Sequence, residues 1–179
     1  MITPPAVDLR AHVRDIPDFP TAGILFRDIT PLLLNPRALD AAVRGLAGQV
    51  AGLGIELVVA AEARGFILGA ALARELGAGF VPARKPGKLP GDTVSAQYTL
   101  EYGLDALEVH ADAFAHGVRV LVHDDLLATG GTARALCDLT SGLGAEIVGC
   151  SFLVELSFLG GRRQLEPHPV HALIEYAEE

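Results

Sequence analysis

Short apolar runs alternate along this chain with segments whose apolar residues recur at helical spacing. The runs have the length of strands that are buried on both faces of a sheet. They lie at residues 55–61, 79–83, 118–123, 147–156 and 172–174. The helical segments lie at residues 36–52, 65–76 and 132–143. Strands that alternate with helices predict an α/β fold with a mostly parallel twisted sheet flanked by helices.

The predicted helices carry end signals of their own. Asn35 followed by Pro36 is an N-cap and first-turn pair, which predicts that a helix begins there. Gly77 predicts the end of the next helix, because glycine readily adopts the left-handed conformation that closes a helix.

Two segments depart from the alternation of strands and helices. Residues 7–13 have the spacing of a short amphipathic helix, whereas the prolines within residues 16–27 exclude a helix and predict an ordered loop. Residues 94–102 and 106–110 alternate between apolar and polar side chains, which predicts an antiparallel pair outside the core sheet. A chain of 179 residues has the length of a single domain.

The chain is acidic, with 14 Lys and Arg against 22 Asp and Glu and a formal net charge of −8. A protein that coats nucleic acid needs a net basic surface, so this charge argues against a nucleic-acid partner. No apolar run approaches the ~20 residues that span a bilayer, and the first residues mix charges with prolines. We therefore expect a cytoplasmic protein with no membrane partner.

Cysteine and lysine are scarce in this sequence. Cys137 and Cys150 lie in apolar segments without the C-x-x-C spacing of a metal or redox site, which predicts buried reduced thiols. Lys85 and Lys88, the lysines of the chain, lie beside Arg84 in a loop rich in glycine and proline. Such a loop either binds an anion or carries lysines only because it is exposed.

The strongest chemical signal follows the apolar run at residues 118–123. Two adjacent carboxylates, Asp124 and Asp125, come next, and a turn of small residues at 128–132 leads directly into a helix. Backbone N–H groups in such a turn, with the partial positive charge of a helix N-terminus, favour a phosphate monoester. The sequence lacks the lysine of a Walker P-loop.

The paired acids Asp124 and Asp125 allow two interpretations. Alone, they fit a solvated strand end with a capping acid. Beside an anion site they would repel a bare phosphate, which favours contact with the hydroxyls of a sugar or with a substrate-borne Mg²⁺.

An apolar strand, two acids and a small-residue loop form the signature of phosphoribosyltransferases that use phosphoribosyl pyrophosphate (PRPP). Over nearly its whole length the chain resembles the adenine phosphoribosyltransferase family, which has the type I fold. The matching stretches are residues 19–30, 62–66, 84–91, 98–103, 124–132 and 153–156.

The resemblance implies a single domain over residues 1–179, with an N-terminal hood at 1–35 that binds the base and a flexible antiparallel lid at 84–110. It implies transfer of ribose 5-phosphate from PRPP to adenine, which gives AMP and pyrophosphate in purine salvage. It also implies that Mg²⁺ arrives with PRPP and that the protein is a homodimer.

The resemblance assigns residues to each part of PRPP. The 5′-phosphate would be held by Ala128, Thr129, Gly130, Gly131 and Thr132. The ribose would contact Asp124 and Asp125, and the pyrophosphate would contact Arg64, Arg84, Lys85 and Lys88. A cation at position 64 opposes the dipole of the helix that begins there, and an anionic ligand would offset that cost.

Other assignments concern adenine and catalysis. By resemblance, Glu101 is the acid/base residue, Arg64 assists catalysis, and Tyr102 closes over the site. Without the family, Glu101 is one exposed acid in an alternating hairpin. Adenine would be bound by Leu25, Phe26, Arg27 and Leu156, although Phe26 and Leu156 also fit ordinary core positions.

Three positions depart from the pattern of the family. Ala22 stands where proline is frequent, Pro86 where another basic residue can occur, and His123 where an aliphatic residue precedes the acids. For His123 we expect a strand imidazole with a satisfied hydrogen bond rather than a catalytic base. The rival functions are the same transfer to hypoxanthine, guanine or xanthine, and a regulator that senses PRPP with this fold.

Overall fold

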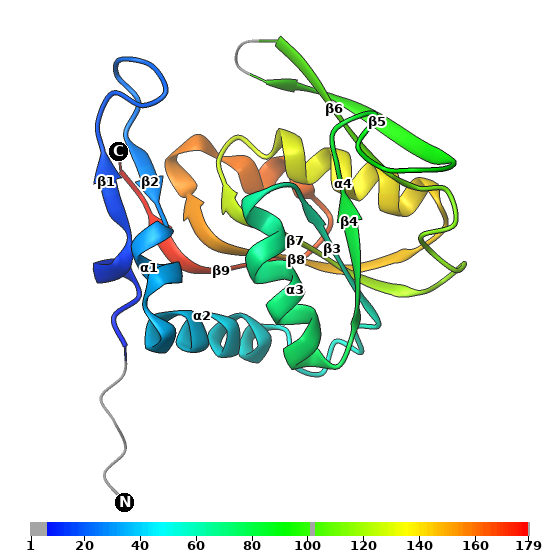
Figure 1. Cartoon of the computed structure of the whole chain (residues 1–179), viewed down its shortest axis with the longest axis horizontal. Helices are drawn as coiled ribbons and strands as arrows, with labels where there is room; N and C mark the ends of the chain where they lie inside the picture. Colours follow the sequence, from blue (N-terminus) through cyan, green and yellow to red (C-terminus); the bar gives the residue numbers. More distant parts are fainter. Residues whose placement is uncertain (1–6, 101–102, 179) are drawn as a thin grey trace, which may run out of the picture.

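A parallel sheet of five strands forms the centre of the computed structural model, which describes residues 7–100 and 103–178. The strands are β3 (Leu57–Ala61), β4 (Gly79–Ala83), β7 (Arg119–Leu127), β8 (Glu146–Leu156) and β9 (Val170–Tyr176). Their order is β4-β3-β7-β8-β9, and every neighbouring pair is parallel (Figure 1). β4 follows β3 along the chain and lies on one side of it, whereas β7, the next strand of this sheet, lies on the other side of β3. The strand order therefore reverses between β3 and β7. Ligands of open α/β sheets bind outside the carboxyl ends of strands at such a reversal.

Helices cover both faces of this sheet. On one face lie α2 (Pro36–Gln49) and α3 (Arg64–Leu76), and on the other lies α4 (Gly131–Gly142) (Figure 1). Successive strand residues point to opposite faces, so Val58 packs in the cluster of α2 and α3 while Val59 packs in the cluster of α4. The predicted flanked parallel sheet is confirmed.

The helix ends follow the capping signals. The Asn35 side chain accepts hydrogen bonds from the N–H groups of Arg37 at 3.0 Å and Ala38 at 3.2 Å. Gly77 ends α3 with φ +69°. α2 ends at Gln49 rather than near Gly52, within the usual fraying of a helix end.

The N-terminal segment differs from its prediction. Residues 7–13 contain only the 3-10 turn η1 (Arg10–His12), and β1 (Arg14–Ile16) pairs antiparallel with β2 (Phe26–Asp28). The expected amphipathic helix is therefore wrong, and the expected loop is bounded by strands. A seven-residue apolar pattern is too short to separate a helix from a strand pair, which gains backbone hydrogen bonds from a partner distant in the sequence. The helix α1 (Thr30–Leu34) was also not predicted.

The predicted antiparallel pair is confirmed as β5 (Thr93–Leu100) and β6 (Gly103–His110). Leu107 and Val109 pack into the same core cluster as α4, so this hairpin lies over that helix (Figure 1). The 3-10 helices η2 (Ser157–Leu159) and η3 (Gly161–Leu165) follow β8 and were not predicted.

Cys137 and Cys150 are buried free thiols, as predicted. Across the described residues 7–100 and 103–178, every helix is too short or too polar to cross a membrane.

Candidate functional site

The paired acids lie within β7 rather than after it. β7 continues to Leu127 because β8 is long enough to pair with it up to Glu155, so the expected strand end before Asp124 is wrong. Its pairing with β3 ends earlier, at His123. Asp124 and Asp125 therefore lie beyond the end of β3, where the strand order reverses and a ligand can approach.

A cation faces these acids from the next helix. Arg64 is the first residue of α3, and its Nε lies 2.9 Å from Oδ2 of Asp125, whose side chain is only 6% exposed. Burial and the neighbouring Asp125 raise the pKa of Asp124, and burial raises the pKa of Asp125 against the opposing effect of Arg64. The pair is therefore reluctant to carry two full negative charges, and Arg64 offsets part of that cost.

Gly65 makes this arrangement possible. A β-carbon at position 65 would lie 2.7 Å from Oδ1 of Asp124. The acid pair and the start of α3 thus fit together only because a glycine follows Arg64.

The phosphate loop, which we define as residues 128–132, connects β7 to α4. Gly130 has φ +92°, a conformation that favours glycine, and Gly131 is the first residue of α4. Among the described residues no side chain caps the start of α4, and its first turn contains no acid. The first N–H groups of α4 therefore have no side-chain acceptor among the described residues, an arrangement that is typical of an anion site.

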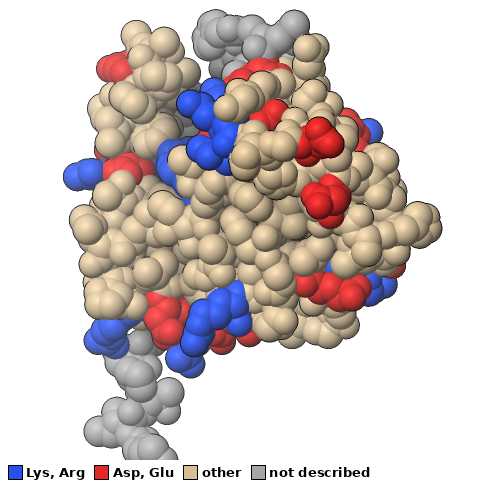
Figure 2. Space-filling view, turned by 45° about the vertical axis from the view of Figure 1, so that its right-hand side comes forward, with Lys and Arg blue, Asp and Glu red and all other residues tan. Residues whose placement is uncertain are grey.

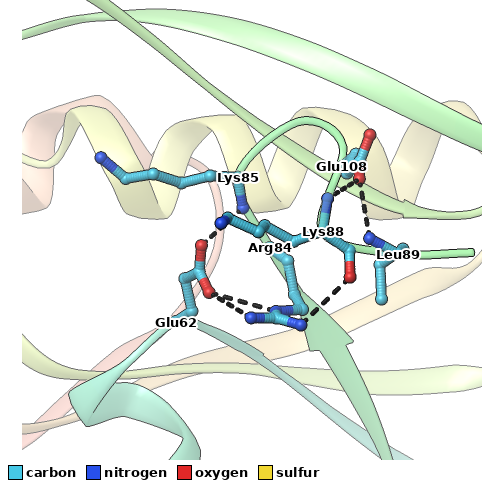
Figure 3. Close-up of polar contacts among 6 residues, drawn as sticks. All are labelled: Glu62, Arg84, Lys85, Lys88, Leu89 and Glu108. Carbon is cyan, nitrogen blue, oxygen red and sulfur yellow. Dashed lines mark hydrogen bonds and ion pairs between the residues drawn. The ribbon is translucent and has the colours of Figure 1, made fainter.

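The basic loop, residues 84–89, folds around two carboxylates (Figure 3). Nε and Nη2 of Arg84 each lie 3.1 Å from Oε2 of Glu62, and the N–H of Lys85 donates to Oε1 at 2.9 Å. The hydrogen bond from Lys85, followed by that from Arg84, lowers the pKa of Glu62. Oε1 of Glu108 accepts from the N–H groups of Lys88 and Leu89, each at 3.2 Å.

The basic loop therefore offers less unpaired charge than its sequence suggests. Nζ of Lys85 lies 2.9 Å from Oδ2 of Asp105, and Arg84 is paired with Glu62. Sequence reasoning missed Glu62 and Glu108 as the acids that shape this loop. Glu62 lies in residues 62–66, a stretch that matches the family, so the sequence did offer a signal for it. Glu108 lies on β6 opposite Arg84, with which it forms a β-bridge, and the alternation of residues along β6 offered a signal for Glu108.

The residues predicted to bind adenine lie around β2 and the ends of β8 and β9. Phe26 is half-buried, its ring stacks edge-on against Phe19 at 5.1 Å, and Cζ of Arg64 lies 5.0 Å from its centroid. Arg64 thus contacts both the acid pair and the predicted base-binding strand. Leu25 is half-buried beside Phe26.

Arg27 and Leu156, the other two residues predicted to bind adenine, both lie beside Tyr176. Cζ of Arg27 lies 4.0 Å above its ring, and Nη1 of Arg27 lies 2.6 Å from Oδ1 of Asp15. Leu156 pairs with Tyr176 across β8 and β9 and is half-buried rather than part of the fully buried core. The surface is hollowed between the N-terminal hairpin and the β5–β6 hairpin, and basic side chains gather there (Figure 2). Glu101 and Tyr102 lie outside the described residues.

His123 does not have the satisfied hydrogen bond that we expected. Its side chain is fully buried, and both ring nitrogens lack a hydrogen-bond partner within the part of the chain that the structure describes. Burial lowers its pKa to about 4, so the ring is neutral at pH 7. A neutral buried imidazole contributes no charge to the acids beside it.

Comparisons with known proteins agree with this geometry. Residues 33–171 match the family described as the phosphoribosyl transferase domain. The chain is 58% identical over 170 residues to the adenine phosphoribosyltransferase of Rhodopirellula baltica. This alignment covers 95% of this chain and 82% of the Rhodopirellula protein. The crystal structure of adenine phosphoribosyltransferase from Thermoanaerobacter pseudethanolicus matches with a TM-score of 0.92 at 48% identity, covering 94% of this chain and 98% of that one.

A third relative was crystallised with ligands. The adenine phosphoribosyltransferase of Saccharomyces cerevisiae, in complex with adenine and D-2,5-dideoxy-2,5-imino-altritol 1,6-bisphosphate, matches with a TM-score of 0.86 at 40% identity. The alignment covers 91% of this chain and 94% of the yeast chain.

Proposed function

The chain belongs to the adenine phosphoribosyltransferase family, and we propose that its described site carries out the family reaction, transfer of ribose 5-phosphate from PRPP to adenine. The products are AMP and pyrophosphate. The observation that carries the proposal is the meeting of Asp125, Arg64 and the glycine-built start of α4 where the strand order reverses.

The phosphate loop binds the 5′-phosphate. Ala128 to Thr132 present backbone N–H groups, and Thr129 and Thr132 add hydroxyl donors. The uncapped N-terminus of α4 supports an anion at this position, since its first N–H groups and the helix dipole favour negative charge.

Asp124 and Asp125 accept hydrogen bonds from the ribose hydroxyls. The cation of Arg64 beside Asp125 favours the ionised carboxylate, which is the strong acceptor for a hydroxyl donor. The family resemblance implies that Mg²⁺ arrives with PRPP, held mainly by its pyrophosphate, and carboxylate oxygens such as those of Asp124 and Asp125 are ligands that Mg²⁺ accepts. Bound in this way, Mg²⁺ would neutralise charge on the leaving group.

Arg64 and the basic loop face the pyrophosphate. Ribose C1 gains positive character as pyrophosphate leaves, so the reaction needs cations on the leaving group and the exclusion of water. Arg64 lies close to Asp125, the proposed ribose contact, and to Phe26, the proposed base contact, and these two contacts support a role for its charge near the leaving group. Arg84 and Lys85 would add charge after exchanging Glu62 and Asp105, respectively, for the ligand, and Lys88 would add charge from the same loop.

Adenine binds against β2. Phe26 stacks on the purine, backbone groups of Leu25 and Arg27 face its edge, and Leu156 covers the other side. The proton that adenine loses from its ring nitrogen goes to Glu101, and Tyr102 closes the site; both assignments rest on the family resemblance. A homodimer in the cytoplasm belongs to the same proposal and rests on the same resemblance.

A parallel assay tests the reaction and its rivals. Pyrophosphate release is measured with PRPP, Mg²⁺ and each of adenine, hypoxanthine, guanine and xanthine. We expect release with adenine. Release with another purine while adenine gives none would contradict the choice of base, and binding of PRPP without turnover on any purine would favour a PRPP-sensing regulator.

A further inference from the structure

The helix η3 (Gly161–Leu165) lies against the phosphate loop. A β-carbon on Gly130 would lie 2.7 Å from the carbonyl oxygen of Gly161. A β-carbon on Gly161 would in turn overlap the carbonyl oxygen of Ala128. Two backbones therefore touch directly, and each side of the contact has room only for glycine.

An ion pair fixes η3 to the sheet. Nε and Nη2 of Arg162 each lie 2.6 Å from a different carboxylate oxygen of Glu155, a residue that is 1% exposed near the end of β8. Nη1 of Arg162 donates to the carbonyl oxygen of Val170 at 2.8 Å, where β9 begins. A bidentate pair of this kind fixes direction as well as distance, so the guanidinium holds η3 to two strands at once.

The other end of η3 is fixed by packing. Leu165 is fully buried in the core cluster that contains Ala133 and Leu136 of α4. Nη1 of Arg134 also donates to the carbonyl oxygen of Gln164 at 3.4 Å. η3 is thus held by the sheet on one side and by the helix that follows the phosphate loop on the other.

We propose that η3 positions the phosphate loop, with Gly161 as the point of contact and Arg162 as the residue that holds η3 in place. This inference rests on the proposed function. A loop of small residues has few side chains of its own to pack, yet its N–H groups bind phosphate only when they converge on one point. Gly161 and Arg162 are positioning residues, because they act on the ligand through the backbone of residues 128–131.

The variant Gly161→Ala tests this contact directly. The added methyl group must displace Ala128, so the KM for PRPP and the Kd of ribose 5-phosphate should rise on the order of tenfold. kcat at saturating PRPP and the KM for adenine should stay within about twofold, since those steps do not depend on how the free loop is held. Gly142→Ala, at the far end of α4, is the matched control because a β-carbon there meets nothing within 4 Å.

Arg162→Lys provides a second variant that keeps a positive charge beside Glu155 but loses the bidentate geometry. We expect the KM for PRPP and the Kd of ribose 5-phosphate to rise by about threefold, with a smaller change in Tm than Gly161→Ala causes. If Gly161→Ala does not fold, this variant alone decides the question. A lower Tm with an unchanged KM for PRPP and an unchanged Kd for ribose 5-phosphate would show a purely structural role and overturn the inference.

The wild-type protein separates this inference from the proposed function. Wild type that neither releases pyrophosphate nor binds ribose 5-phosphate, measured by calorimetry, overturns both. Wild type that does both, together with variants of equal affinity, overturns only the role of η3.

Discussion

The two ends of the proposed PRPP site are built by different means. At the 5′-phosphate end, glycines let backbone pack against backbone, with Gly130 at φ +92° against Gly161. At the pyrophosphate end, charges hold the basic loop, and the side chains of Arg84 and Lys85 are 36% and 57% exposed. One end depends on shape and the other on charge, so a single added methyl group should disturb the first more than the loss of one exposed charge disturbs the second.

Gly130→Ala should give the largest effect. Position 130 needs a left-handed backbone, and the new β-carbon would lie 2.7 Å from the carbonyl oxygen of Gly161. We expect the KM for PRPP to rise roughly a hundredfold, because misplaced N–H groups no longer converge on the phosphate. Steady-state kinetics measure this rise. Gly48→Ala is the control, since a β-carbon there has no neighbour within 4 Å, and a change below about threefold at Gly130 would contradict the shape argument.

Arg64→Met should give the next largest effect. Arg64 pairs with Asp125, the proposed ribose contact, and lies close to Phe26, the proposed base contact. We expect kcat/KM for PRPP to fall by about 10- to 100-fold through the loss of a cation near the leaving group. Arg44→Met is the matched control, because Arg44 is exposed and pairs with Asp40 on the surface of α2. Equal kcat/KM for wild type and Arg64→Met would remove Arg64 from the reaction.

Lys85→Met should give a small effect that depends on salt. Lys85 is paired with Asp105 and more than half exposed, so much of its charge is already neutralised. We expect the KM for PRPP to rise by about threefold at low ionic strength, and the difference from wild type to shrink in about 0.5 M salt. Steady-state kinetics at two salt concentrations measure both the rise in KM and its dependence on salt. A tenfold or larger rise that salt leaves unchanged would mean that this end also depends on shape.

His123→Leu should leave activity at pH 7 unchanged and alter only the pH dependence of stability. Burial lowers the pKa of His123 to about 4 from 6.5. Between these two pH values the imidazole is protonated in the unfolded chain and neutral in the folded chain. The free energy of unfolding of wild type therefore falls by up to about 3 kcal/mol as the pH falls from 6.5 towards 4, at ~1.4 kcal/mol per pH unit. Urea unfolding at pH 7 and pH 5 should show this loss in wild type and a smaller loss in the variant. An equal loss in both proteins would contradict it.

The sheet and the phosphate loop could be predicted because their signals are local. The run before Asp124, the small residues after it and the cap at Asn35 each act within a few residues, and the structure confirms the elements they predict. The N-terminal hairpin could not be predicted in the same way. Its strands are stabilised by pairing with each other and by the ion pair of Arg27 with Asp15, neither of which is visible in a short apolar pattern.

The site was predictable where its residues are consecutive and less so where they converge from distant segments. Glu62 lies next to the basic loop only because β3 and β4 pair. Gly161 reaches the phosphate loop only because η3 folds back against it. Both contacts arise from tertiary packing, so neither partner is visible in the neighbouring residues, although Glu62 lies in a stretch that matches the family.

The proposed reaction and the proposed role of Gly130 are tested most directly by AMP formation from adenine and PRPP, followed by chromatography, with wild type and Gly130→Ala at the same low PRPP concentration. We expect AMP with wild type, little AMP with the variant, and recovery of AMP formation by the variant when the PRPP concentration is raised. No AMP with wild type, or equal rates for both proteins at low PRPP, would contradict it.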